Sequence, residues 1–165
     1  MGTDKQLFEQ LNKLSGPKTV IVGIGNILKG DDGTGPIVCQ QLTGKVCADL
    51  IDAGTVPENY IQTIIKKTPQ NLLIIDAVDF GASPGTINIF KPEQLNSFVF
   101  STHTLSPHLF VDMIRSELEV DVHLVGIQPA QIGLGQSISP QVSRAVQWLT
   151  RTFTEIFALK VKRNK

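Results

Sequence analysis

The chain has 165 residues, of which 41% are apolar and 18% are charged. This is the size of one domain with a substantial core, so the composition excludes wholesale disorder and leaves too little chain for two domains of usual size. Fifteen basic residues balance fifteen acidic ones, and this balance argues against the clustered positive charge that nucleic-acid binding needs.

The cysteines and the uncharged stretches argue against a disulfide-rich protein and against a membrane protein. Cys39 and Cys47 are too few for a disulfide scaffold, and their spacing is not that of a zinc knuckle. The longest uncharged stretch, 124–143, is too rich in Gln, Gly, Ser and Pro to span a bilayer, and the N-terminus does not resemble a signal peptide. We therefore expect a soluble, cytoplasmic protein without a membrane or nucleic-acid partner.

Helical and strand patterns alternate along the chain. In the first half they predict a helix at 4–14, a strand at 19–24, a helix that has Pro36 in its first turn, a strand at 46–51 and a helix from Pro57. In the second half they predict a strand at 72–76, an edge or half-buried strand at 85–90, a helix from Ser106-Pro107, a strand at 120–127 and a helix from Ser139-Pro140. The helix from Ser106-Pro107 is expected to carry Phe110, Met113, Ile114 and Leu118 on its apolar face.

This alternation predicts an α/β fold of three layers, in which a twisted, mostly parallel sheet of about five strands is flanked by α-helices on both faces. We interpret residues 1–165 as a single domain. Within it, 1–17 provides an extra N-terminal helix and 160–165 is a basic tail.

Polar residues follow the predicted strands where each strand ends. Asp31 and Asp32 lie in the loop after the first strand, Asp52 ends the second, Asp76 ends the third, and His103 precedes a helix. In an open α/β sheet, ligands bind beyond the carboxyl ends of the strands. Asp32, Asp76 and His103 would supply two oxygens and one imidazole nitrogen, a set that suits a divalent metal such as Ni²⁺ or Zn²⁺.

The glycine-rich loop at 25–35 also invites a nucleotide-binding interpretation, which its residues contradict. After Gly23 and Gly25, the third glycine of a dinucleotide fingerprint is replaced by Leu28. A phosphate-binding loop would need Lys and Ser or Thr where Asp31 and Asp32 stand, and two carboxylates repel phosphate. We expect no nucleotide.

The same residues also allow purely structural roles. Asp31 or Asp32 could be the N-cap of the next helix, or the two could form a pair of acids that shares a proton. Asp76 could bind backbone amides in a turn at the strand end. His103 taken alone could be structural, and we place His108 and His123 outside the site.

Several motifs in order give the chain a resemblance to a known family. They are Val22-Gly23-Ile24-Gly25-Asn26, Gly30-Asp31-Asp32-Gly33-Thr34-Gly35, Asp52-Ala53-Gly54-Thr55, Pro57-Glu58-Asn59, Asp76-Ala77-Val78-Asp79-Phe80-Gly81, Pro84-Gly85, Thr102-His103 and Gly126-Ile127-Gln128-Pro129. Together they resemble the [NiFe]-hydrogenase maturation endopeptidases over about residues 19–150. The segments at 57–59 and 102–103 look most like the branch that serves formate-linked or energy-conserving hydrogenases.

The resemblance implies a function. Members of this family remove a C-terminal extension from the hydrogenase large-subunit precursor after nickel insertion, and the nickel carried by the substrate is taken as the recognition element. The family fold, a twisted sheet between helices, agrees with the pattern above. A non-hydrolytic nickel-binding chaperone or checkpoint factor of hydrogenase assembly is the alternative, because the same ligands would serve it.

The resemblance also implies roles for particular residues. The metal-contacting positions of the family fall on Asp32, Asp76 and His103, with the two aspartates as the catalytic candidates. A second group is expected to support them: Asp52, Gly25, Asn26 and Asp31. The nickel would arrive with the nickel-loaded precursor, although other divalent metals are expected to occupy the site in the isolated protein.

Overall fold

The computed structural model describes residues 2–98 and 106–159, and its elements follow the predicted alternation closely. The helices are α1 (Gly2–Leu14), α2 (Thr34–Leu42), α3 (Ile61–Lys67), α4 (Pro107–Arg115) and α5 (Pro140–Ile156), and the strands are β1 (Thr19–Ile24), β2 (Asp49–Gly54), β3 (Asn71–Ala77), β4 (Ile87–Phe90) and β5 (Asp121–Ile127). Short 3₁₀ turns occupy Gly30–Gly33, Pro57–Tyr60 and Pro92–Ser97.

The five strands form one sheet in the order β2-β1-β3-β5-β4. The first four run parallel, and β4 pairs antiparallel with β5 at the edge. Every residue of β1 is buried, as expected of a parallel strand covered on both faces. The half-buried pattern of β4 confirms the predicted edge strand.

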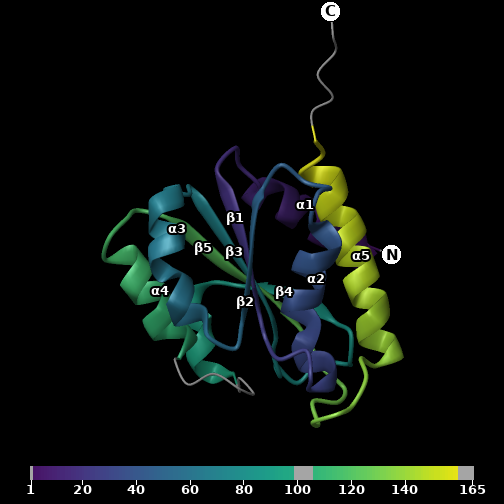
Figure 1. Cartoon of the computed structure of the whole chain (residues 1–165). Coiled ribbons are helices and arrows are strands. Elements are labelled where there is room, and N and C mark those ends of the chain that lie inside the picture. The colour runs from purple at the N-terminus through teal and green to yellow at the C-terminus, as the bar shows by residue number, and fades with distance from the viewer. Residues whose placement is uncertain (1, 99–105, 160–165) are drawn as a thin grey trace, which may run out of the picture.

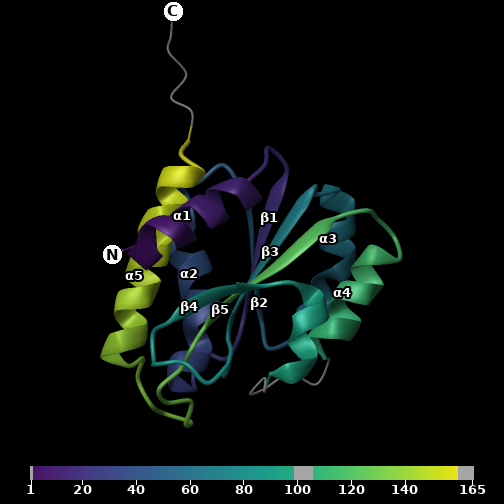
Figure 2. The same ribbon diagram turned by 180° about the vertical axis from the view of Figure 1, so that it is seen from behind.

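Helices cover both faces of the sheet (Figure 1). Helices α1, α2 and α5 lie on one face, where Leu11, Val38 and Phe153 belong to one buried cluster. Helices α3 and α4 lie on the other face, where Ile64 and Phe110 belong to a second cluster. Figure 2 shows the same division from behind, with β3 and β5 between the two helical layers. The predicted three-layer architecture is therefore confirmed.

The starts of the two C-terminal helices follow from local chemistry. Ser106 and Ser139 are the N-cap residues of α4 and α5, and each hydroxyl accepts a hydrogen bond from the backbone N–H three residues later. A proline follows each serine in the first turn, where a missing N–H costs nothing. Both predicted helix starts are confirmed.

Two details of the prediction were wrong. The second strand begins at Asp49 instead of Val46, because Val46 forms an isolated bridge with Ala158 near the C-terminus. In α4, Phe110 and Ile114 are buried as predicted, but Met113 is exposed and Val111 is buried in addition. A helix of nine residues has too few turns for its pattern to define one face, and in the structure α4 packs against both the 3₁₀ turn Pro92–Ser97 and α3.

The strand order creates a switch point between β1 and β3. From β1 the chain crosses through α2 to β2 on one side, whereas from β3 it continues to β4 and β5 on the other. The loops that follow these two central strands therefore diverge, and such a point is where open α/β sheets bind ligands. Within residues 2–98 and 106–159, none of the helices has the length and apolarity needed to cross a bilayer.

Candidate active site

In the loop after β1 the chain turns back, so that Asp32 lies next to Gly25 and Asn26 at the carboxyl end of β1. Gly25 has a φ of +144°, and a Cβ there would collide with the backbone oxygen of Asp32. Glycine is therefore required by both conformation and space. The N–H of Gly25 donates to the carbonyl of Gly54 at the end of β2, which ties this turn to the neighbouring strand.

Asp32 is fully buried at this turn. Its Oδ2 accepts a hydrogen bond of 3.0 Å from the backbone N–H of Asn26, and the Oδ1 of Asn26 accepts one of 2.9 Å from the N–H of Leu28. The glycine–asparagine turn thus wraps over Asp32 and fixes its carboxylate. The predicted supporting residues Gly25 and Asn26 both lie in contact with Asp32.

Asp31 is also fully buried, and it faces a different part of the chain. Its Oδ2 accepts from the N–H groups of Ala130 and Gln131, at 2.8 and 3.0 Å, and from the hydroxyl of Ser139 at 2.9 Å. Its Oδ1 accepts from the N–H of Ser139 at 2.7 Å. Four donors on one carboxylate make Asp31 the anchor of the loop after β5.

These bonds decide between the structural alternatives for the first loop. Helix α2 begins after Gly33, which is its N-cap residue, so neither aspartate caps it. The carboxylates of Asp31 and Asp32 bind different segments, at 130–139 and at 26, which argues against a proton shared between them.

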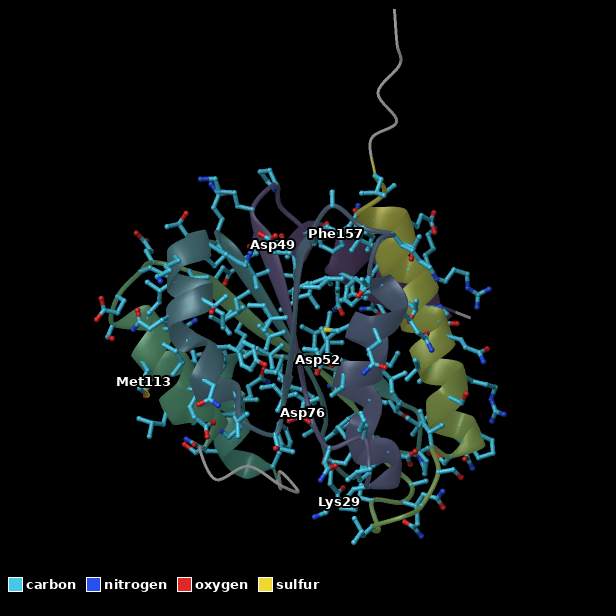
Figure 3. All side chains as sticks on the ribbon, viewed as in Figure 1. Lys29, Asp49, Asp52, Asp76, Met113 and Phe157 are labelled. Atoms are coloured by element: carbon cyan, nitrogen blue, oxygen red, sulfur yellow. The ribbon has the colours of Figure 1, made fainter. Side chains whose placement is uncertain are left out.

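Asp76 ends the central strand β3 next to this loop. It is 1% exposed and is paired in register with Gly126 of β5. Gly35 brings the two ends together, because a Cβ there would collide with the carbonyls of Ile24 and Ile75. Asp76 therefore lies where β3 meets the turn that carries Asp32, at the switch point of the sheet. Figure 3 shows it at the same end of the sheet as Lys29, opposite Asp49 and Phe157.

Asp52 lies at the end of β2 and is exposed. Its carboxylate accepts hydrogen bonds from the N–H of Gly54 at 3.2 Å and from the side chain of Gln40 at 3.4 Å. Burial, followed by the charge of Asp52, raises the pKa of the Cys39 thiol to about 12. Asp52 thus shapes the turn at the end of β2 and faces α2.

Two of the three histidines lie within the described residues: His108 is in the first turn of α4 and His123 is in β5. His103, the predicted nitrogen ligand, lies outside the described residues. His123 is in the third position of β5, in register with Leu73 and away from the strand's carboxyl end. Burial lowers its pKa against the opposing charge of Asp121. Among the described residues alone, no group of three or more His, Cys, Asp or Glu side chains is arranged to hold a metal.

Gln128 is a site residue to which sequence reasoning gave no role. It is buried directly after β5, and its Oε1 accepts from the N–H groups of Phe80 and Ala82 at 2.8 and 3.2 Å. Its Nε2 donates to Asp79 at 3.0 Å. This side chain holds the loop that follows Asp76. The signal that identifies it in the sequence is a polar residue directly after an apolar strand, the same signal that identifies Asp76.

Comparison with known protein families identifies the family of this chain. The family model described as HycI, hydrogenase maturation protease, matches residues 39–156. The chain belongs to the hydrogenase maturation protease family. The resemblance inferred from the motifs is therefore confirmed, and so is the expectation of an enzyme.

Individual maturation proteases show similarity over most of the chain. The hydrogenase 3 maturation protease of Escherichia coli K12 is 32% identical over 131 residues, covering 78% of this chain and 83% of the relative. A putative hydrogenase maturation protease of Methanocaldococcus jannaschii is 33% identical over 149 residues, covering 84% and 88%. The crystal structure of a [NiFe] hydrogenase maturation protease, HycI, from Thermococcus kodakarensis superposes with a TM-score of 0.82 at 29% identity, covering 90% of this chain and 98% of that one.

Proposed function

We propose that this maturation protease removes the C-terminal extension of a [NiFe]-hydrogenase large-subunit precursor after nickel insertion. In this proposal Asp32, Asp76 and His103 contact the nickel that the precursor carries. Nickel is thus part of the substrate, and the protease contributes oxygen and nitrogen ligands that complete its coordination.

One observation supports the proposal most strongly. Two buried carboxylates lie at the switch point of the sheet: Asp76 is near the end of β3, and Asp32 is in the 3₁₀ turn that follows β1 and contacts β3. Surrounding contacts fix them: the Asn26 turn holds Asp32, and Gln128 holds the loop after Asp76. Rigid, preorganised ligands are what recognition of one metal centre requires.

Contact with nickel would position the scissile bond. A folded precursor held at its metal centre presents the adjacent C-terminal peptide to the same edge of the sheet, which converts its hydrolysis into a reaction between groups already in place. Two routes to the attacking water fit this arrangement. One carboxylate acts as general base, or the nickel polarises the carbonyl or the water.

The test is the mass of the purified precursor, nickel-loaded and nickel-free, after incubation with the protease. We expect loss of one defined C-terminal peptide from the nickel-loaded form alone. His103→Ala and Asp76→Asn should abolish this loss while leaving the circular dichroism spectrum unchanged. Cleavage of both forms at equal rates would contradict nickel recognition, and binding without cleavage would favour the checkpoint-factor alternative.

A further inference from the structure

Exposed apolar side chains gather at the same edge of the sheet as the candidate site. The described chain has eight large apolar side chains that are exposed, and five of them lie in loops that follow strands: Ile27, Leu28, Val56, Ile132 and Leu134. Leu28 is 63% exposed and Leu134 is 75% exposed. Clustered exposed apolar residues commonly mark an interaction surface.

Two of these loops are joined to each other. Three backbone hydrogen bonds connect the segment after β1 with the segment after β5: Gly135 N–H to Leu28 O at 2.8 Å, Gly30 N–H to Gln136 O at 3.0 Å, and Asp31 N–H to Gln131 O at 2.8 Å. The side chains of Ile27, Leu28, Ile132 and Leu134 therefore belong to one double-loop structure, whose exposed apolar surface we call the apolar rim.

The rim has a fixed base. The carboxylate of Asp31 binds the start of the second loop at Ala130 and Gln131, and its end at Ser139. Gly30 has a φ of +53°, and a Cβ there would approach the carbonyl of Gln131. A surface held in this way loses little conformational freedom on binding, which favours affinity.

The rim is continuous with the proposed catalytic residues. Leu28 is hydrogen-bonded to Asn26, which is hydrogen-bonded to Asp32. On the other side, Ile132 lines a cavity of about 180 Å³ that reaches the end of β3 beside Asp76, with the remaining lining residues being Ala77, Asp79, Gln128, Pro129, Ala130 and Gln131. The rim therefore adjoins the segments that carry both carboxylates, and a folded protein seated at this edge of the sheet would contact it.

The charge of the rim selects the kind of surface that fits it. In the segments 26–30 and 129–137, Lys29 is the one ionisable residue, and 129–137 contains none. Such a surface matches an apolar patch that bears few charges, with at most a carboxylate opposite Lys29.

We propose that the apolar rim is the docking surface for the folded hydrogenase large-subunit precursor, and that it packs against an apolar, nearly uncharged patch beside the precursor's nickel centre. This inference rests on the proposed function. The rim supplies binding energy through contacts away from the reacting bond, so its loss should weaken precursor binding and leave the chemical step intact.

The test uses Leu28→Asp and Leu134→Asp, with Met113→Asp as the matched control. Met113 is an exposed apolar residue of α4 and lies far from Lys29 (Figure 3). For the nickel-loaded precursor we expect each rim variant to raise KM at least about tenfold with kcat within about twofold of the wild type. The control should keep both constants. Circular dichroism and the Tm confirm that all three variants fold.

Binding of the precursor to each variant, measured by interferometry, separates the two proposals. If the wild type cleaves or binds the precursor and the rim variants do so equally well, the docking surface is wrong and the proposed function is unaffected. If the wild type binds without cleaving, the protease function fails, and weaker binding by the rim variants still supports docking. If the wild type neither binds nor cleaves, both proposals fail.

The oligomeric state tests a different occupant of the rim. If the wild type is a dimer that Leu134→Asp converts to a monomer while KM stays unchanged, the rim is a self-association surface and the docking proposal is wrong.

Discussion

Asp31 and Asp32 are neighbours in the chain, and their carboxylates have different surroundings. Asp31 receives four hydrogen bonds from the loop after β5, whereas Asp32 is held by the Asn26 turn beside Asp76. The sequence indicated that both belong to the site region. It could not separate the anchor from the candidate ligand, because the donors to Asp31 come from residues about a hundred positions away.

Replacement of Asp31 should therefore lower stability. In Asp31→Asn, one oxygen becomes an NH₂ group that faces N–H donors, so buried donors lose their acceptor. We expect a loss of about 1–3 kcal/mol in the free energy of unfolding, measured by urea denaturation. Asp112→Asn, on the exposed side of α4, is the control and should change it by less than about 0.5 kcal/mol. Equal stability of Asp31→Asn and the control would refute the anchor role.

Cys39 gives a prediction about reactivity and pH. Burial and the charge of Asp52 raise its pKa to about 12, while Cys47 is exposed. Thiolates react and thiols do not, so iodoacetamide at about pH 8 should label Cys47 alone in the folded protein and both cysteines in urea. Labelling of Cys39 in the folded state would contradict its burial.

The raised pKa of Cys39 also makes the free energy of unfolding depend on pH. The unfolded chain loses the Cys39 proton at a lower pH than the folded chain, so this thiol stabilises the fold fully below the unfolded pKa. That stability declines from about pH 8.5 upward and is lost as the pH approaches 12. Cys39→Ala should remove this part of the slope in denaturation curves measured between these values.

At the scale of elements, apolar runs predict the central strands well. The runs at 19–24 and 72–76 are mostly apolar, and they are buried in β1 and β3. The local sequence pattern therefore identifies these two strands. The second strand was displaced because Val46 and Cys47 bind residues 157–158 near the C-terminus. Local patterns carry no information about such a distant partner.

The central position of β3 predicts strong sensitivity to charge. Ile75 is fully buried between β1 and β5, so Ile75→Asp places an unpaired carboxylate in the core at a cost of several kcal/mol. We expect this variant to be unfolded by circular dichroism. Asn88→Asp on the exposed side of the edge strand β4 should fold normally. A folded and active Ile75→Asp would contradict the burial of β3 on both faces.

At the scale of the whole molecule, the strand order decides where the site lies. The sequence predicted the fold class and which residues follow each strand. It could not predict the order β2-β1-β3-β5-β4, which depends on pairings between distant segments. That order makes β1 and β3 neighbours, so the 3₁₀ turn that carries Asp32 lies next to the end of β3 that carries Asp76. The hydrogen bond from Phe80 to the side chain of Gln128 also joins segments that are far apart in the sequence, and so do the bonds between the two loops of the apolar rim. The sequence could not predict these contacts either.

The most direct test of the central claim is the preference of the protease for nickel-loaded over nickel-free precursor, measured as a ratio of Kd values. The precursor is made resistant to cleavage by a proline at the bond that the mass measurement identifies. We predict that the wild type prefers the nickel-loaded form at least about tenfold, a difference of about 1.4 kcal/mol. The double variant Asp32→Asn, Asp76→Asn should bind both forms equally. A double variant that keeps the wild-type ratio would show that these carboxylates do not contact the nickel.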